Sequence, residues 1–402
     1  MASRDPAAYP PAPVEKRALL EVLSSFKESV MLPPSAYTDP AVFEWERRHI
    51  FGGGWTCAAR GAQLPAPGDQ LAVPGGVLLV RGDDGTARAF ANTCRHRGHE
   101  LLPCGATTQA GAVVCPYHSW TYRLDGRLRG APGYRDADAA RWSLTALPVA
   151  EWHGLLFVDM SGGAAGELPL AGLHPVISPH QPSRTQVAAT RTYDAAANWK
   201  ILTENYHECY HCPSIHLELC RVSPPRSGQN YPASGAWIGG WMSLRPGAET
   251  MSLDGRSGGV PLRGLSGDAL RTVIYVAIFP NVLLSLHPDY VMTHILRPVA
   301  ADRTIIECSW SFAPEAAGRP DFDPAYAADF WDLTNQQDWA ACESVQRGLS
   351  SPFASAGPLA PGEDAVHSFV TTVARVYLGE RVAEWPLPAA AGPETAERRS
   401  VG

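Results

Sequence analysis

The chain lacks the features that mark membrane proteins and nucleic-acid-binding proteins. None of its apolar runs approaches the roughly 20 residues that a helix needs to cross a bilayer, and it has no run of basic residues. Its formal net charge of −7 at pH 7 also argues against nucleic acid as a partner. Residues 1–6 lack the apolar core of a signal peptide. We therefore expect a cytoplasmic protein that binds neither a membrane nor nucleic acid.

Cysteine is also sparse. The 402 residues include 9 cysteines, an odd number at scattered positions, which argues against a disulfide framework. Outside Cys94 and Cys115, the cysteines are expected to be mostly free, packed thiols, namely Cys57, Cys104, Cys209, Cys212, Cys220, Cys308 and Cys342.

The most informative motif that is present pairs a cysteine with a histidine twice. One residue separates Cys94 from His96, and two residues separate Cys115 from His118. Two thiolates and two imidazoles on two tight loops can hold a [2Fe–2S] cluster, with the cysteines on one iron and the histidines on the other, which is a Rieske centre. The same groups could hold one tetrahedral zinc. The Rieske centre is favoured, because zinc sites more often show paired C-x-x-C spacing.

A second group of metal-binding side chains follows at Glu208, His211 and His216. We expect a helix from Asp194 to Cys212 that places Glu208 and His211 on one face, and we expect Pro213 to end it so that the next loop brings His216 round. Two histidines and one carboxylate form the facial triad of non-haem Fe(II) oxygenases. The candidate carboxylates are Asp338, which is preferred because an unpaired charge in a mainly apolar helix would be costly, and its competitors Asp329, Asp332 and Glu343.

The same stretch also matches a different motif. His207, Glu208 and His211 fit H-E-x-x-H, in which two histidines bind zinc and the glutamate is the base of a metalloprotease. The match is formal, because Pro213 interrupts the segment and Ser214 stands where the longer zinc-protease motif has glycine.

The length predicts two domains, or one large core with an inserted module. The fold class is expected to be α+β, with an antiparallel β Rieske module inserted into a catalytic domain of helices on an antiparallel sheet. The expected divisions are an N-terminal segment whose helix, 39–50, packs on the catalytic domain (1–53), the Rieske domain (54–165), the mononuclear iron domain (166–384) and a flexible tail (385–402). Strand patterns occupy 271–279, 282–286, 291–297 and 304–312, and a long helix is expected over 324–348.

The motifs resemble those of the α subunits of Rieske-type non-haem iron oxygenases. The matching stretches are 92–98, 115–120, 198–206, 208–216 and 337–348, in the expected order over nearly the whole chain. The resemblance implies that Cys94, His96, Cys115 and His118 hold the cluster, and that His211, His216 and Asp338 hold the mononuclear Fe(II). It also implies that Glu208 bridges the two metal sites. Many ring-hydroxylating members carry Asp there, and the Glu is more similar to the branch that oxidises quaternary ammonium compounds.

The resemblance further implies a homotrimer in which electrons pass from His118 of one subunit through Glu208 to His211 of the next. Because the sequence has no G-x-G-x-x-G and no flavin motif, a separate NAD(P)H-dependent reductase or ferredoxin is expected to supply them. The expected function is monooxygenation of a quaternary ammonium compound, by N-demethylation or by choline-type oxidation. The alternatives are an aromatic ring-hydroxylating dioxygenase and an electron-transfer Rieske protein without oxygenase activity.

Five aromatic residues are candidates for the substrate pocket, where a ring would attract a trimethylammonium group by about 0.5–2 kcal/mol. They are Trp237, Trp241, Tyr275, Phe279 and Trp331. The same rings would suit a flat aromatic ligand or a hydrophobic core.

Overall fold

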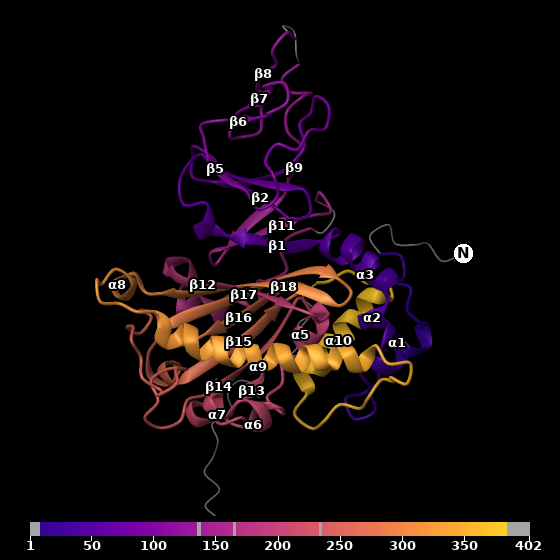
Figure 1. Cartoon of the computed structure of the whole chain (residues 1–402), viewed down its shortest axis with the longest axis vertical. Helices are drawn as coiled ribbons and strands as arrows, with labels where there is room; N and C mark the ends of the chain where they lie inside the picture. The colour runs from indigo at the N-terminus through magenta and orange to yellow at the C-terminus, as the bar shows by residue number, and fades with distance from the viewer. Residues whose placement is uncertain (1–8, 135–137, 164–165, 233–234, 384–402) are drawn as a thin grey trace, which may run out of the picture.

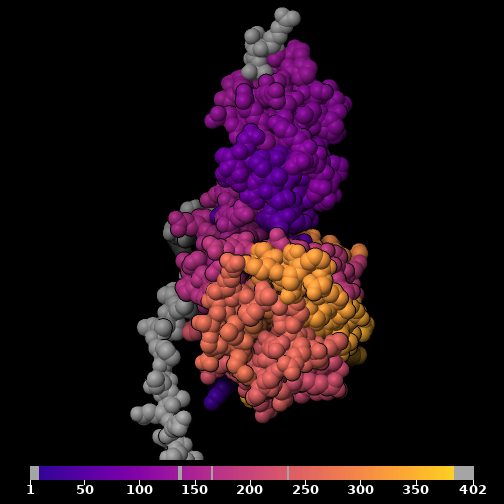
Figure 2. All heavy atoms as spheres, turned by 90° about the vertical axis from the view of Figure 1, so that its left-hand side faces the viewer, coloured from indigo at the N-terminus to yellow at the C-terminus, as the bar shows by residue number. Residues whose placement is uncertain are grey.

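The computed structural model describes residues 9–134, 138–163, 166–232 and 235–383. Figure 1 shows a β module, formed by early residues, that stands on a larger part made of a sheet and helices. Figure 2 shows the same two parts from the side, as an upper and a lower lobe. The α+β class and the insertion of the β module are confirmed. The expected tail, 385–402, lies outside the described residues.

The β module consists of three small antiparallel sheets with the strand orders β1-β11-β10, β5-β2-β3-β4-β9 and β6-β7-β8. The strands are short, and β3 and β11 are buried along their whole length, so side chains from both of their faces pack in the interior. The strands are β1 (Trp55–Arg60), β2 (Asp69–Val73), β3 (Val77–Arg81), β4 (Ala87–Ala91), β5 (Thr107–Gln109), β6 (Val113–Val114), β7 (Thr121–Tyr122), β8 (Leu128–Gly130), β9 (Ala146–Leu147), β10 (Val149–Trp152) and β11 (Leu155–Asp159).

The larger part is built on a seven-stranded antiparallel sheet with the order β12-β18-β17-β16-β15-β14-β13. Strands β15 to β18 fall where the sequence predicted them. The strands are β12 (Gln186–Ala195), β13 (Gln229–Asn230), β14 (Trp237–Ser243), β15 (Thr272–Ile278), β16 (Val282–Leu286), β17 (Tyr290–Ala300) and β18 (Arg303–Phe312).

Helices cover one face of this sheet, with α9 running across it and α5 and α10 beside it (Figure 1). The helix that begins after Asp39 is also present, and Asp39 caps it by accepting from the Ala41 amide at 2.8 Å. The helices are α1 (Lys16–Val22), α2 (Ser35–Thr38), α3 (Pro40–Glu46), α4 (His174–Ile177), α5 (Trp199–Tyr206), α6 (Cys212–Ile215), α7 (Leu217–Val222), α8 (Pro314–Ala317), α9 (Ala325–Leu349) and α10 (Asp364–Tyr377). None of the helices in the described part of the chain is long and apolar enough to cross a membrane.

The two faces of the large sheet have different neighbours. Leu283 and Leu296 pack in a core with residues of α3, α5 and α10. Val282 and Leu284, on the alternate face, pack with Cys57 and with residues of β11. The β module therefore sits on the face of the sheet opposite to the helices.

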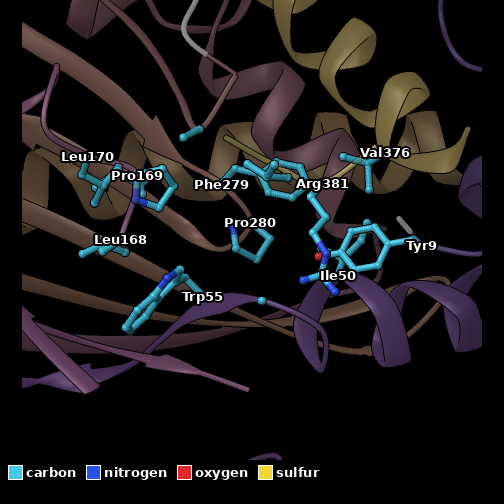
Figure 3. Close-up of a pocket in the computed structure, with 14 residues that line it drawn as sticks. Tyr9, Ile50, Trp55, Leu168, Pro169, Leu170, Phe279, Pro280, Val376 and Arg381 are labelled. Carbon is cyan, nitrogen blue, oxygen red and sulfur yellow. The ribbon is translucent and has the colours of Figure 1, made fainter. Parts of the chain in front are cut away.

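Polar contacts fix the β module to the sheet. The Asn281 side chain accepts from the Cys57 amide and donates to the Cys57 carbonyl, both at 3.0 Å, and Arg297 donates to the carbonyls of Cys57 and Ala58. A small apolar pocket of about 40 Å³ lies beside this junction, between Trp55, Phe279 and Tyr9 (Figure 3). Its lining has no cluster of metal-binding groups, and it is separate from the site that carries the histidines.

The helix predicted from Asp194 to Cys212 is wrong at both ends. Asp194 lies in β12, and the helix begins only after Asn198, whose side chain accepts from the Lys200 amide. It ends at Tyr206, and Pro213 occupies the first turn of α6 instead of stopping a helix. Pro is tolerated there because the first amides of a helix have no partner within it. Glu208 and His211 consequently lie on the turn between α5 and α6.

The expectation of mostly free thiols holds for Cys57, Cys308 and Cys342, which are buried, whereas Cys104 is free but exposed. It is wrong for Cys209 and Cys212, which form a disulfide across the turn that carries His211. Because only two residues separate them, this pairing follows from the tight turn, which the predicted helix had concealed.

Candidate active site

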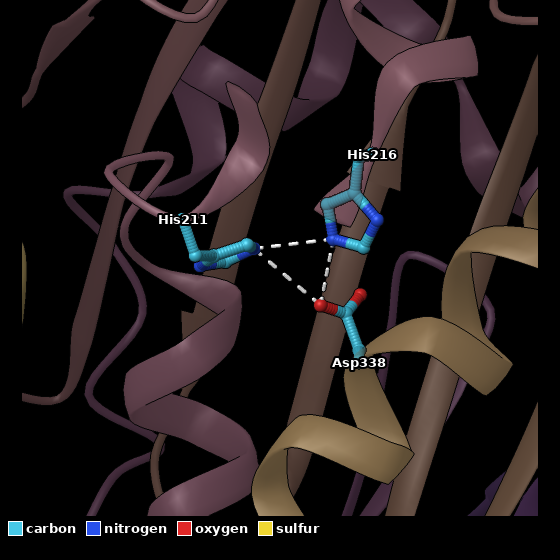
Figure 4. Close-up of side chains that lie close together, drawn as sticks. All are labelled: His211, His216 and Asp338. Atoms are coloured by element: carbon cyan, nitrogen blue, oxygen red, sulfur yellow. Dashed lines mark hydrogen bonds and ion pairs between the residues drawn. The ribbon is translucent and has the colours of Figure 1, made fainter. Parts of the chain in front are cut away.

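His211, His216 and Asp338 converge on one point, with ligand atoms that all lie within 4.8 Å of one another. Figure 4 shows the two imidazoles and the carboxylate pointing toward each other, with Asp338 projecting from α9. His216 Nε2 lies 3.1 Å from His211 Nε2 and 2.8 Å from Asp338 Oδ1, and His211 Nε2 lies 3.4 Å from the same oxygen. The structure thus brings together residues that are 122 positions apart in the chain.

The outward nitrogens of both histidines also have partners. His211 Nδ1 hydrogen-bonds to Glu208 Oε1, and His216 Nδ1 lies 2.7 Å from Gln337 Oε1. The Glu208 carboxylate also accepts from the His211 amide at 3.1 Å, which holds the turn in place. A partner on the outward nitrogen fixes the ring orientation and leaves the inner nitrogen available to a metal. Gln337, which precedes Asp338 directly, is in position to orient His216, a role that the sequence analysis did not assign to it.

Hydrogen bonds between the two histidines and Asp338 shift the pKa values of His211 and Asp338. Burial lowers the pKa of His211, but its hydrogen bonds to Asp338 and Glu208 outweigh this and raise it to about 9. Burial raises the pKa of Asp338, but its hydrogen bonds to the two histidines leave it below the usual value. The arrangement therefore favours an ionised carboxylate beside a positive charge, which a divalent cation would supply in place of the proton.

The other candidate ligands are engaged elsewhere. His207 does not join the three residues, and burial lowers its pKa to about 3, so the histidine pair of the zinc-protease motif does not form. The three competing carboxylates have other partners. Asp329 binds Arg191, Asp332 accepts from the Tyr193 hydroxyl, and Glu343 accepts from the Ala196 amide.

The cysteine and histidine pairs sit on two loops at the far end of the β module. The Cys94 amide donates to the His99 carbonyl at 2.8 Å, and the Cys115 amide donates to the Trp120 carbonyl at 2.8 Å, so each loop is closed on itself. Gly98 provides a positive φ of 73° in the first loop, a conformation that glycine adopts without strain.

These loops separate the thiols from the imidazoles. Cys94 and Cys115 are buried, whereas His96 and His118 are exposed with their ring centroids 4.7 Å apart. The Tyr122 hydroxyl lies 3.3 Å from Cys94 Sγ. The two thiols could hold one iron of a Rieske cluster and the two imidazoles the other.

A cavity of about 630 Å³ opens over His211, His216 and Asp338. Of the five aromatic candidates, Trp241, Tyr275 and Trp331 line it. Trp237 and Phe279 do not: Trp237 packs in the core on the other face of the sheet, and Phe279 packs against Trp199. Strand alternation explains why Trp237 lies outside the cavity: it pairs with Ile278 and faces away from Tyr275.

Tyr206 is a cavity residue that the sequence analysis missed. Its ring lies 6.0 Å from that of Tyr275, which in turn lies 6.4 Å from Trp331. In the regular register, Trp241 lies opposite Ile274 while Tyr275 lies opposite Gly240, so the two rings alternate to opposite faces. The continuous aromatic wall therefore consists of Tyr206, Tyr275 and Trp331.

The donor sets fit the two metal groups expected from the sequence. Two imidazole nitrogens and one carboxylate oxygen leave positions open around a mononuclear iron, as in the facial triad. Two thiols and two imidazoles on paired loops fit a Rieske cluster.

Comparison with known proteins agrees with this donor chemistry. Residues 54–148 match the Rieske [2Fe-2S] domain family, and residues 182–379 match the family of ring hydroxylating alpha subunits (catalytic domain). The glycine betaine monooxygenase oxygenase subunit of Pseudomonas aeruginosa is 30% identical over 377 residues, which cover 85% of this chain and 88% of that protein.

Solved structures share the fold. A quaternary ammonium Rieske monooxygenase, described in connection with carnitine oxidation and inter-subunit electron transfer, superposes with a TM-score of 0.73 at 24% identity, covering 92% of this chain and 100% of that one. Naphthalene 1,2-dioxygenase from Rhodococcus sp. gives a TM-score of 0.70 at 20% identity, covering 90% and 97%. The chain belongs to the Rieske-type non-haem iron oxygenases, as an α subunit with a [2Fe–2S] domain and a non-haem iron catalytic domain.

Proposed function

We propose that this protein is the oxygenase component of a monooxygenase that hydroxylates a methyl group of a quaternary ammonium compound. The observation that carries the proposal is the aromatic wall of Tyr206, Tyr275 and Trp331 in the same cavity as His211 and His216. Its support from relatives is the 30% identity, over most of both chains, to a glycine betaine monooxygenase oxygenase subunit.

In this proposal the four cysteine and histidine residues of the β module hold the cluster, and His211, His216 and Asp338 hold the iron. The bound iron supplies O₂ activation, with electrons delivered through the cluster. Glu208 and Gln337 keep the two imidazoles oriented by binding their outward nitrogens.

The protein's own part in the reaction is to place one methyl group over the three ligands. Faces of aromatic rings attract a trimethylammonium group, and each ring contributes about 0.5–2 kcal/mol depending on how dry the site is. One O₂, two electrons and two protons convert the N-methyl group to N-hydroxymethyl and release water. The hydroxymethyl group then leaves as formaldehyde, and its hydroxyl proton passes to the amine.

The proposal includes a separate reductase and a homotrimer with electron transfer between subunits. Three observations support the trimer. His96 and His118 are exposed at the end of the β module, that module lies on the sheet face opposite to the helices, and a relative of the same fold is described with inter-subunit electron transfer. Glu208, beside His211, is the residue proposed to meet the neighbour's His118.

A mixing experiment tests this assembly. Cys115→Ser removes a cluster ligand and Asp338→Ala removes an iron ligand, so each variant alone is inactive. If electrons pass between subunits, mixing and reassociating the two variants restores part of the turnover, because some interfaces join an intact cluster to an intact iron site. Complete lack of recovery, with mixed oligomers detected by mass spectrometry, contradicts transfer between subunits.

The substrate class is tested with purified protein, a reductase and NADH. Glycine betaine, L-carnitine, choline and naphthalene are each supplied, and O₂ uptake and products are measured. We expect formaldehyde in proportion to the ammonium substrate consumed. Oxidation of naphthalene to a dihydrodiol, with no ammonium compound consumed, would identify the alternative, an arene dioxygenase.

A further inference from the structure

The cavity carries a cationic side chain that neither the metal sites nor the aromatic wall uses. Among the described residues that line it, Arg226 is the only lysine or arginine. It has no ion pair or hydrogen bond within the part of the chain that the structure describes. An unpaired guanidinium at the wall of a binding cavity is available to a ligand.

The carboxylates of the same cavity are already occupied. Glu208 binds His211, Asp338 binds both histidines, and Asp364 accepts from the Asn230 side chain at 2.9 Å. None of these three carboxylates forms an ion pair with Arg226.

The segment that carries Arg226 is held against β14. The Ser227 hydroxyl donates to the Ser243 carbonyl at 3.2 Å and accepts from the Ser243 amide at 3.1 Å. Gly228 packs so closely that a Cβ there would lie 1.7 Å from the Trp241 carbonyl oxygen. The backbone that follows Arg226 is thus held against β14, and the exposed Arg226 side chain lines the same cavity as Trp241 and Met242.

We infer that Arg226 selects for a substrate that carries a carboxylate together with its quaternary ammonium group, and so for a betaine over choline. The inference rests on the proposed function and narrows it. The aromatic wall takes the ammonium group, and the guanidinium takes the carboxylate through charge-assisted hydrogen bonds, for which its planar fork is suited. Choline offers a hydroxyl group in place of the carboxylate and has no negative charge for Arg226.

The test compares two probes that differ only in this charge, glycine betaine and its neutral amide, both of which would release formaldehyde on demethylation. We expect the wild-type protein to prefer glycine betaine in kcat/KM. Arg226→Ala should lower kcat/KM for glycine betaine about tenfold or more, mostly through KM, and change that for the amide less than about twofold. Arg226→Lys should recover part of the preference.

Arg221→Ala is the matched control, because it removes an exposed arginine on α7 that does not line the cavity. This control variant should leave kcat/KM unchanged for both glycine betaine and its amide. Equal losses for both probes in Arg226→Ala, or a wild-type protein that prefers the amide or choline, would overturn the selection by Arg226 while leaving the proposed oxidation of ammonium compounds intact. Absence of turnover with every ammonium compound would overturn both.

Discussion

The two metal-binding regions of this chain are built in opposite ways. The proposed cluster ligands come from two loops of one small module, and each loop closes through its own backbone hydrogen bonds. The triad joins the turn after α5 to the middle of α9, which depends on the packing of the whole catalytic domain. A local site is thus specified by a short motif, whereas an assembled site needs the tertiary structure to be correct first.

Removal of one proposed metal ligand from each site is expected to have the largest effects on activity and metal content, and to affect the two sites separately. Asp338→Ala should abolish coupled product formation, by more than about 100-fold, and lower bound iron while the visible spectrum of the Rieske cluster is kept. Cys115→Ser should do the reverse, with loss of the cluster and retention of the mononuclear iron. Metal analysis and absorption spectra measure both, and unchanged turnover in Asp338→Ala would show that the triad is not catalytic.

The assembled site should also depend on the buried core behind α5. Glu204 accepts from the Tyr37 hydroxyl, and burial raises its pKa to about 8. A carboxyl group whose pKa is higher in the folded state binds its proton more tightly there, so its contribution to stability is complete below about pH 4.5 and is lost as the pH rises through about 8.

We therefore expect the free energy of unfolding to fall by a few kcal/mol between pH 5 and pH 8.5 from this group alone. Glu204→Gln keeps a side-chain oxygen that can accept from Tyr37 and removes the titration, so its unfolding in urea should depend less on pH. A pH dependence identical to that of the wild-type protein would show that Glu204 does not titrate in this range.

The disulfide between Cys209 and Cys212 closes the turn that contains His211 and should stabilise that turn. Because it closes a very short loop, its loss through Cys209→Ser with Cys212→Ser should cost about 2 kcal/mol of stability. Urea unfolding of metal-free protein measures this, with Cys104→Ser as a control at an exposed free thiol. Equal stability of the double variant and the wild-type protein would contradict a structural contribution.

The smallest effect is expected at Gln337, which binds the outward nitrogen of His216. Gln337→Leu removes that partner while keeping the size of the side chain, and should weaken iron binding about tenfold with the cluster unchanged. Iron titration of metal-depleted protein measures the change, and Gln336→Leu, on the neighbouring exposed position, is the control.

The same contrast explains what the sequence revealed. The cluster motif and strands β15 to β18 could be predicted because each depends on the residue pattern within a short segment. The helix from Asp194 was misplaced because its residues are compatible with both a strand and a helix, and pairing of β12 with β18 decides between them. Tyr206, Gln337 and Arg226 could not be assigned, since their roles depend on neighbours that are distant in the chain. Asp338 could be preferred over its competitors because an unpaired charge in a mainly apolar helix is costly, and the family resemblance strengthened that preference.

The position of the β module has a consequence for the working concentration of the enzyme. Within one chain the seven-stranded sheet stands between that module and the helical side of the sheet, where α9 carries Asp338. If electrons pass only between subunits, as proposed above, a single chain with both metal groups bound could not complete turnover. Specific activity should then fall when the protein is diluted below the dissociation constant of the subunits, even though each chain keeps both of its metal sites filled.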